Sequence, residues 1–326
     1  MSRPKPPASP GAAPPWQART WLIGFGLALL AIMLAIAGGA MLARRPPAGT
    51  RPEPPPPLPS PPQIESASVD ELLAIRTDAR WQPRWLRDNG AVLVIQFPSL
   101  QAQGRALNRA AALIEKGGAR RDRVLTDTEL HAAMAASGDN EASYFLGHDY
   151  RAEDLGRFFS LAQAQQLALN ADELRLRQLL LDAGLLRATA SGPFSGAPAR
   201  ALISFSAEQA DDPATPQDES MDGRRRESVL RHELSHGRYF TDSRYHNHCW
   251  WFWREGLSQA ERQVWRRYLE RLGYDPANEE LLVNETQALL MHTPDTRDFN
   301  ASALGMGERQ LQAMRARFRQ GLTEGG

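Results

Sequence analysis

The sequence has almost no cysteine: Cys249 is the only one in 326 residues. A single cysteine excludes an intramolecular disulfide framework and a zinc site built from several thiolates. It does not define the compartment, because a protein without disulfides can reside on either side of a membrane. A metal bound to this chain must therefore be held mainly by histidine, aspartate and glutamate side chains.

An excess of charge of one sign is also missing. The chain has 38 Lys+Arg and 38 Asp+Glu, a formal net charge of zero. Binding to a phosphate backbone needs a surplus of positive charge on some face. We therefore expect no nucleic acid partner, and the composition leaves the oligomeric state open.

Charged residues are absent from residues 21–43, a run of 23 mostly apolar residues. As a helix this run would be roughly 34 Å long, enough to cross the core of a bilayer. We expect an uncleaved transmembrane signal anchor after a disordered tail over residues 1–20. A cleaved signal peptide, cut near residues 35–37, is the alternative, but the apolar run is long for one. Basic residues flank the run almost equally, so the expected topology, one pass through the inner membrane with an extracytoplasmic body, follows the commoner arrangement for an N-terminal anchor.

Proline is concentrated just after this run, with ten prolines among residues 46–62. Such a segment cannot form a helix or a central strand and favours extended polyproline II. We expect residues 44–63 to be a linker that holds the body away from the lipid. Residues 64–326 then form the folded domain.

The body is expected to be α+β and mainly helical. Residues 91–97 and 201–206 are short apolar runs rich in β-branched side chains, which predicts two buried strands. Residues 186–190 are a third strand candidate, and the chain from residue 224 onward has a helical pattern throughout. A few strands together with many helices indicate an α+β domain. The earlier helices are expected at residues 69–87, 103–117, 126–136, 152–166 and 171–186.

The most informative motif is His232-Glu233-Leu234-Ser235-His236, an HExxH. On a helix, residues four apart lie on one face, so both imidazoles can reach one cation. Zinc suits this set, because catalytic zinc sites use nitrogen and oxygen ligands and keep one position for water. Zinc lowers the pKa of that water, and Glu233 is placed to take its proton as general base.

A third ligand is needed, and two glutamates compete for the role. Glu255 follows His236 after 18 residues and Glu285 after 48 residues. Glu255 precedes Gly256 and a Ser258–Glu261 capping box, so it is expected at the end of a helix beside a turn. Glu285 lies inside an uninterrupted helical run, where the backbone can hold its carboxylate in place. We favour Glu285.

Other polar residues near the motif have more than one possible role. His292 is seven residues after Glu285 and roughly 10 Å further along the same helix, so we name it as a catalytic residue that stabilises the oxyanion. A histidine at a helix end can equally interact with the helix dipole, and Tyr239 and Tyr245 are further donor candidates. The pair His246 and His248 precedes four aromatic residues, which indicates an aromatic packing helix and not a second metal site.

Residues 227–292 resemble the gluzincin branch of the zincin metallopeptidases. The body also resembles an uncharacterised bacterial family of membrane-anchored HExxH peptidases, through HELSHGRYFTD and NEELLVNETQA. The resemblance implies zinc bound by His232, His236 and Glu285, with Glu233 as the base. Thermolysin-like members have an aspartate where this chain has Leu289, which leaves Asp242 and Asn284 as candidates to support a ligand histidine. Zincins also bind substrate along an edge strand, and residues 201–206 are the candidate for it.

The expected function is a membrane-anchored zinc peptidase that acts on peptide or protein substrates. One alternative keeps the metal without turnover: a membrane-tethered zinc-binding scaffold module of the cell envelope. Another is a hydrolase of non-peptidic substrates that uses the same residues. A fourth protein ligand would favour the scaffold, and a narrow closed pocket would favour the non-peptidic hydrolase.

Overall fold

The computed structural model describes residues 63–75, 79–189 and 192–324. The tail expected at residues 1–20, the membrane anchor expected at 21–43 and the linker up to residue 62 lie outside the described residues. Among those that are described, no helix is both long and apolar enough to cross a membrane. The described body is mostly helical with a small mixed sheet, so the expected α+β class is confirmed.

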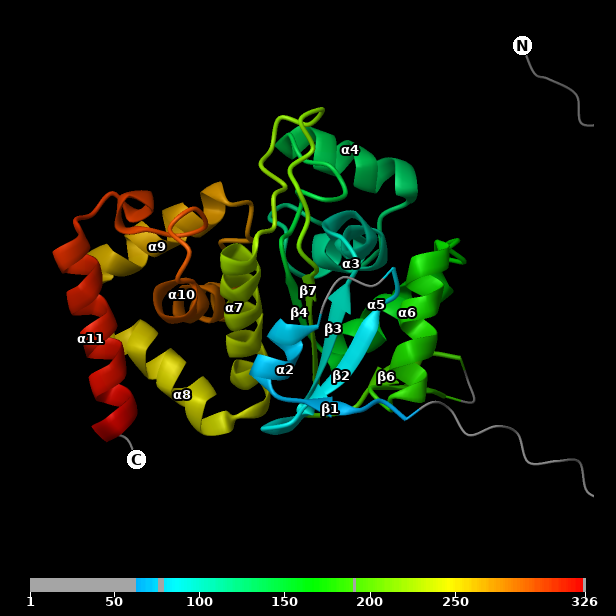
Figure 1. Cartoon of the computed structure of the whole chain (residues 1–326), viewed down its shortest axis with the longest axis horizontal. Helices are drawn as coiled ribbons and strands as arrows, with labels where there is room; N and C mark the ends of the chain where they lie inside the picture. Colours follow the sequence, from blue (N-terminus) through cyan, green and yellow to red (C-terminus); the bar gives the residue numbers. More distant parts are fainter. Residues whose placement is uncertain (1–62, 76–78, 190–191, 325–326) are drawn as a thin grey trace, which may run out of the picture. The chain divides into compact units, whose positions relative to one another are not determined.

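The main sheet has five strands in the order β1-β2-β3-β7-β4 (Figure 1). Pairing is parallel between β1 and β2 and between β3 and β7, and antiparallel between β2 and β3 and between β7 and β4. A separate hairpin pairs β5 with β6, so the third strand candidate is confirmed over its first three residues. The strands are β1 (Ser66–Ala67), β2 (Gln82–Leu86), β3 (Asn89–Phe97), β4 (His148–Arg151), β5 (Leu186–Ala188), β6 (Phe194–Gly196) and β7 (Ala201–Ser206).

The helix expected over residues 69–87 is wrong in its second half. Helix α2 (Val69–Ala74) begins at a capping box between Ser68 and Glu71 and ends after six residues. Residues 82–86 instead form β2, which pairs with β3. Pro83 explains the difference, because a proline inside a helix removes a hydrogen bond and clashes with the preceding turn.

Alternating side chains of the two central strands divide the core between the faces of the sheet. One set, which includes Leu93, Ile95 and Leu202, packs with α3, α5 and α6. The opposite set, which includes Val92 and Ile203, packs with α7. The helices of this half agree with the expected ranges within a few residues: α3 (Leu100–Ile114), α4 (Asp127–Ser137), α5 (Ala152–Ala164) and α6 (Ala171–Asp182).

The rest of the chain is helical, as expected, and packs on the far side of α7 from the sheet (Figure 1). Its core is rich in aromatic side chains, among them Trp253, Trp265, Phe299 and Phe318. Helix α7 therefore lies between a sheet and a group of helices. The elements are α7 (Gly223–Thr241), α8 (Ser243–Trp251), the π-helical turn η1 (Phe252–Gly256), α9 (Gln259–Arg271), α10 (Glu279–His292), the 3₁₀ turn η2 (Ala301–Leu304) and α11 (Glu308–Glu324).

Candidate metal centre

Helix α7 carries the HExxH motif and is held tightly against the sheet. Asp222 caps its first turn by accepting a hydrogen bond from the amide of Arg225. Gly237 faces the sheet, where a Cβ atom would lie 3.1 Å from the side chain of Val92. A larger residue at 237 would push the helix outward, so the glycine fixes the distance between α7 and the sheet. The motif histidines therefore project from a helix of fixed orientation.

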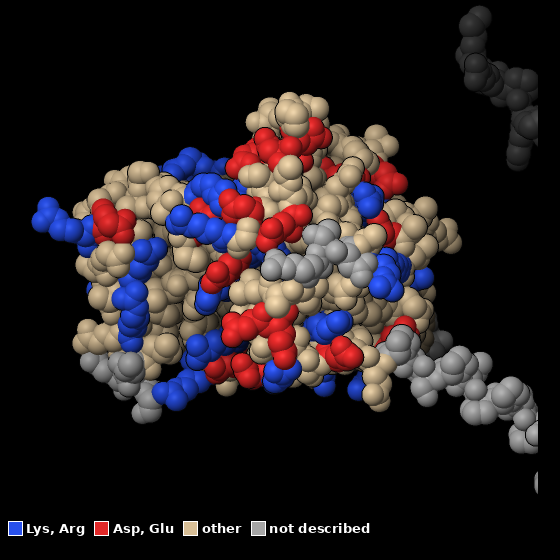
Figure 2. Space-filling view, viewed as in Figure 1, with Lys and Arg blue, Asp and Glu red and all other residues tan. Residues whose placement is uncertain are grey.

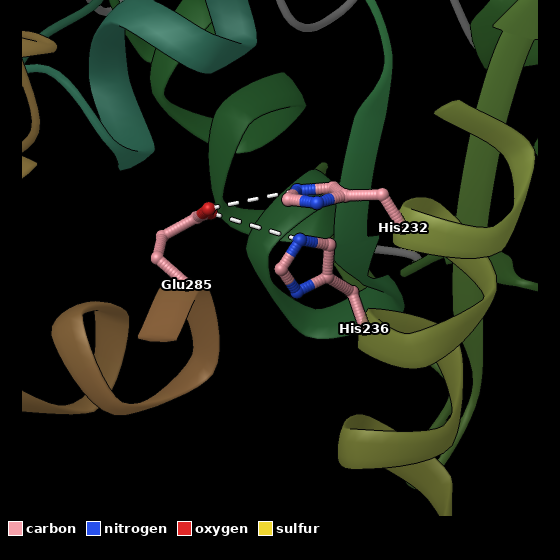
Figure 3. Close-up of side chains that lie close together, drawn as sticks. All are labelled: His232, His236 and Glu285. Atoms are coloured by element: carbon pink, nitrogen blue, oxygen red, sulfur yellow. Dashed lines mark ion pairs between the residues drawn. The ribbon is translucent and has the colours of Figure 1, made fainter. Parts of the chain in front are cut away.

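His232 and His236 lie one turn apart on α7, with ring centroids 4.6 Å from each other. Glu285, from the buried part of α10, points toward both rings (Figure 3). Its Oε2 is 3.6 Å from Nε2 of His232, and its Oε1 is 3.7 Å from Nε2 of His236. All three residues offer ligand atoms within 4.8 Å of one another. The two elements thus bring together the residues expected to bind zinc.

Several polar atoms around this point have no hydrogen-bond partner within the described part of the chain. They are Nε2 of His236, Oε2 of Glu285 and Oε2 of Glu233, and all three are buried. Burying such atoms without a partner costs free energy, so native proteins rarely leave them unsatisfied. Two imidazole nitrogens and a carboxylate are the ligands that zinc prefers. The donor set therefore fits the expected ion.

Burial controls the protonation of these groups. It lowers the pKa of His232 to about 4 and that of His236 to about 4, so both rings are neutral near pH 7. A neutral imidazole has the free lone pair that a metal ligand needs. Burial also raises the pKa of Glu233 well above its usual value, and the carboxylates of Glu285 and Glu115 raise it further. A cation at this point would relieve that repulsion.

Each of the two histidines expected to bind zinc has a polar neighbour at Nδ1. Nδ1 of His232 donates to Oγ1 of Thr293 (2.8 Å), whose hydroxyl donates to the carbonyl of Ala288. This bond leaves Nε2 of His232 as the acceptor nitrogen that faces Glu285. Nδ1 of His236 lies 3.7 Å from Oδ2 of Asp149, on β4. Sequence reasoning missed both Thr293 and Asp149.

The two supporting residues expected from the sequence lie in different places. Asn284 is part of the centre, because its Nδ2 donates to the Asp149 carboxylate at 3.4 Å. Asp242 is not: its Oδ1 caps α8 and its Oδ2 accepts from Arg238. The proposal of Asp242 as a support for a ligand histidine is therefore wrong, because the residue is committed to the turn between α7 and α8.

The competing glutamate, Glu255, is exposed on η1 and borders a different cavity with Trp250 and Trp251. Glu255 lies where the sequence predicted it, at the end of a helical segment just before the Ser258 capping box. The ring of His246 packs against Tyr239, and that of His248 meets Phe318 edge to face, in agreement with an aromatic packing helix.

His292 lies near the centre but does not border its cavity. Its Nε2 is hydrogen-bonded to the hydroxyl of Tyr245 at 2.9 Å, and that hydroxyl donates to Gln287. Tyr239, like Tyr245, is buried away from the cavity wall. The catalytic role of His292 stays a prediction. Tyr274, which the sequence did not single out, does border the cavity, and its side chain counteracts the rise in the pKa of Glu285 that burial causes.

A cavity of about 220 Å³ adjoins the candidate metal centre. His232 and Glu233 form one wall, and residues 143–147 form another. Gly147 lies directly against Glu233, where any Cβ atom would overlap the carboxylate. Glycine is therefore required at 147 for the chain to pass this close to the expected base. The volume is below the roughly 300–1,000 Å³ of pockets for larger ligands, and it suits one amino-acid side chain.

The strand over residues 201–206, expected to lie at the edge of the sheet, lies in its interior. Strand β7 lies between β3 and β4, and all six of its residues are buried. Both of its hydrogen-bonding edges are occupied, so the prediction of residues 201–206 as an edge strand is wrong. Among the described strands, β4 is the one at this end of the sheet, and residues 143–147 of the cavity wall lead into it.

Comparisons with protein-family models, with curated proteins and with solved structures found no significant match to this chain.

Proposed function

We propose that this chain is a zinc-dependent peptidase of the gluzincin type, with its body on the extracytoplasmic side of the inner membrane and residues 21–43 as the anchor. One observation carries the proposal: His232 and His236 on α7 meet Glu285 of α10 beside a cavity that Glu233 also borders. Helices from separate parts of the sequence build this arrangement, which an accidental HExxH would not produce.

The chain's own residues have separable tasks in this proposal. His232, His236 and Glu285 would hold zinc, which supplies Lewis acidity and lowers the pKa of water when bound. Glu233 accepts a proton from the attacking water and delivers it to the leaving amine. Burial and the neighbouring carboxylates raise the pKa of Glu233. A cation held by the three ligands would lower this pKa again and leave Glu233 ionised, as a base must be. Gly147 keeps the Glu233 carboxylate in place by lying directly against it.

Turnover is favoured over a scaffold role by the size of the ligand set. Within the described residues, no fourth histidine, cysteine, aspartate or glutamate joins the three at the same distances. Structural zinc sites use four protein ligands, whereas catalytic sites use three and leave a position for water. The adjoining cavity gives a substrate access to that position.

The unpaired edge of strand β4 favours a peptide as the substrate. Strand β4 pairs on one side with β7, and no other described strand pairs with its second side. An extended peptide can add to such an edge through main-chain hydrogen bonds while one side chain enters a pocket. The cavity beside Glu233 is of a size to take that side chain.

The replacement Glu233→Gln in the full-length, zinc-loaded chain tests the proposal. General-base catalysis is worth about 10²- to 10⁴-fold in rate. We expect cleavage of a peptide mixture, followed by mass spectrometry, to fall by that factor while the zinc content is unchanged. Glu227→Gln is the control, since Glu227 lies on the same helix and pairs with Arg231 at its surface. Undiminished cleavage by zinc-loaded Glu233→Gln would refute the assigned mechanism.

A further inference from the structure

The chain uses arginine for almost all of its positive charge, and basic and acidic side chains are interspersed on the face shown in Figure 2. Of the 38 Lys+Arg residues, only Lys5 and Lys116 are lysines. Lys116 is therefore the only lysine among the described residues, and it borders the same cavity as His232 and Glu233. A lysine ammonium is a compact charge with three donors on a flexible stem, whereas a guanidinium is a wide planar fork. The smaller group suits a cavity of this volume.

The ammonium of Lys116 lies at the cavity wall itself. Its Nζ is 4.2 Å from the ring centroid of Tyr144 and 4.4 Å from that of Phe145, both of which border the cavity. On the other side, a Cβ atom at Gly273 would lie 3.4 Å from Nζ, between the cavity residues Leu272 and Tyr274. The rings attract the cation through their faces and hold it in place.

Lys116 has no carboxylate within ion-pair distance in the described part of the chain. Glu115 and Asp139 attract it only from a longer range, and Ser137 and Ser143 already donate hydrogen bonds to Asp139. The acid of the same wall, Asp298, is by contrast paired with Arg225 at 3.0 Å. A half-buried ammonium without a counter-ion is unfavourable.

We propose that Lys116 is the recognition group of a substrate subsite that takes a carboxylate next to the bond to be cleaved. The carboxylate could be the C-terminus of a peptide or the side chain of an aspartate or glutamate. Exposed Leu272 at the rim would contact the apolar part of the same residue. This inference rests on the proposed function, because it assumes that the peptide is held at the metal centre.

Three small hydroxamates test the subsite by binding to the zinc-loaded, full-length chain. They share a metal-binding hydroxamate-succinyl group and carry glutamine amide, glutamine with a free C-terminal carboxylate, or glutamate amide. A charge-assisted hydrogen bond in a partly buried site strengthens binding by about tenfold or more. We expect calorimetry to show at least one carboxylate probe binding tighter than the neutral probe by this factor. The carboxylate probe that binds more tightly than the neutral probe shows whether the subsite takes a C-terminal or a side-chain carboxylate.

Lys116→Met should remove this preference and leave the affinity for the neutral probe unchanged. Lys116→Arg should keep part of it, since the charge remains, and Lys5→Met is the control that removes the other lysine. Binding of the neutral probe by Lys116→Met shows that the variant is folded. Equal affinity of the wild-type chain for all three probes, or a preference that survives in Lys116→Met, would overturn the subsite and leave the metal centre intact. Failure of every hydroxamate to bind would overturn the proposed function together with the subsite.

Discussion

The two sides of α7 are built differently. On one side, the sheet half (residues 63–206) packs mainly aliphatic side chains and alanine, with a smaller share of aromatic rings such as Phe97 and Phe158. On the other, the helical half (residues 243–324) fills the spaces between helices with tryptophan, tyrosine and phenylalanine. A flat sheet lets a helix approach closely, which is why Gly237 faces it. Helices without a sheet leave irregular gaps that large rings fill.

The candidate site combines contributions from both halves. The ligands come from α7 and α10, next to the helical half's aromatic core. The sheet half supplies Gly147 beside Glu233, Asp149 near His236 and Lys116 in the cavity wall. The helical half adds Leu272 and Tyr274 to that wall. Helix α7 and the helical half would thus bind the metal, and the sheet half would position the base and bring Lys116 to the cavity. This division can be tested by changing one half at a time.

Replacement of Glu285, the proposed ligand on α10, should have the largest effect of these changes, because it should abolish zinc binding. Glu285→Gln takes away the carboxylate that lies near both imidazoles. We expect zinc content after dialysis, measured by atomic emission, to fall from about one per chain to near zero, because catalytic sites need three protein ligands. Glu255→Gln, on exposed η1, should keep its zinc. The reverse result would return the ligand role to Glu255.

Gly147→Ala should impair turnover without removing the metal. The new Cβ atom would overlap the Glu233 carboxylate and force it to move. A small misplacement of a catalytic group costs about 10²-fold in rate. We expect kcat to fall by that factor at unchanged zinc content. Gly90→Ala, where a Cβ atom meets nothing within 4 Å, is the control. Equal activity of the two variants would show that the sheet half does not position the base.

The halves also differ in how much of them the sequence predicts. For α7 and the helical half, helical spacing predicted His232, Glu233 and His236 on one helix and Glu285 on another. The structure brings the two histidines and Glu285 together. Helix geometry repeats every turn, so local spacing predicts which side chains share a face. The capping box at Ser258 was also visible as a local pattern and separated Glu255 from Glu285.

The site residues of the sheet half could not be predicted from the sequence, because their positions depend on pairing between distant strands. Strand β4 has four residues, too few to show an alternating pattern, and it joins the sheet by pairing with β7 about fifty residues later. Asp149 and Gly147 could not be placed near the centre without that pairing. Thr293 was missed for a related reason, since it lies just beyond α10 and meets His232 only through the packing of α10 on α7.

A pair of substitutions compares the two halves directly, because His232 has its polar neighbour in the helical half and His236 has its neighbour in the sheet half. Thr293→Val removes the hydroxyl that bonds His232, and Asp149→Asn removes the charge near His236. Loss of such a partner costs about 10- to 100-fold in metal affinity. We expect competition with a zinc chelator to show this loss for Thr293→Val and less for Asp149→Asn, because the 3.7 Å contact is longer than a hydrogen bond. Thr293→Ser should restore binding, and failure to do so would mean that the methyl group matters more than the hydroxyl.

A smaller effect is expected from Glu115, a buried acid at the end of α3 that has no role as a ligand. Burial raises its pKa to about 8, and the charge of Glu285 adds to the shift. Between its unfolded value of about 4.3 and this folded value, the folded state keeps a proton that the unfolded chain releases, so stability falls as the pH rises. Glu115→Gln mimics the protonated acid at every pH. In chelator, its free energy of unfolding should therefore exceed that of the wild type by a margin that grows by on the order of 1 kcal/mol from pH 6 to 7. Denaturant unfolding at the two pH values measures the margin. A constant margin would mean that Glu115 is already ionised in the fold, with the positive charge of the sheet half, Lys116 first, compensating for it.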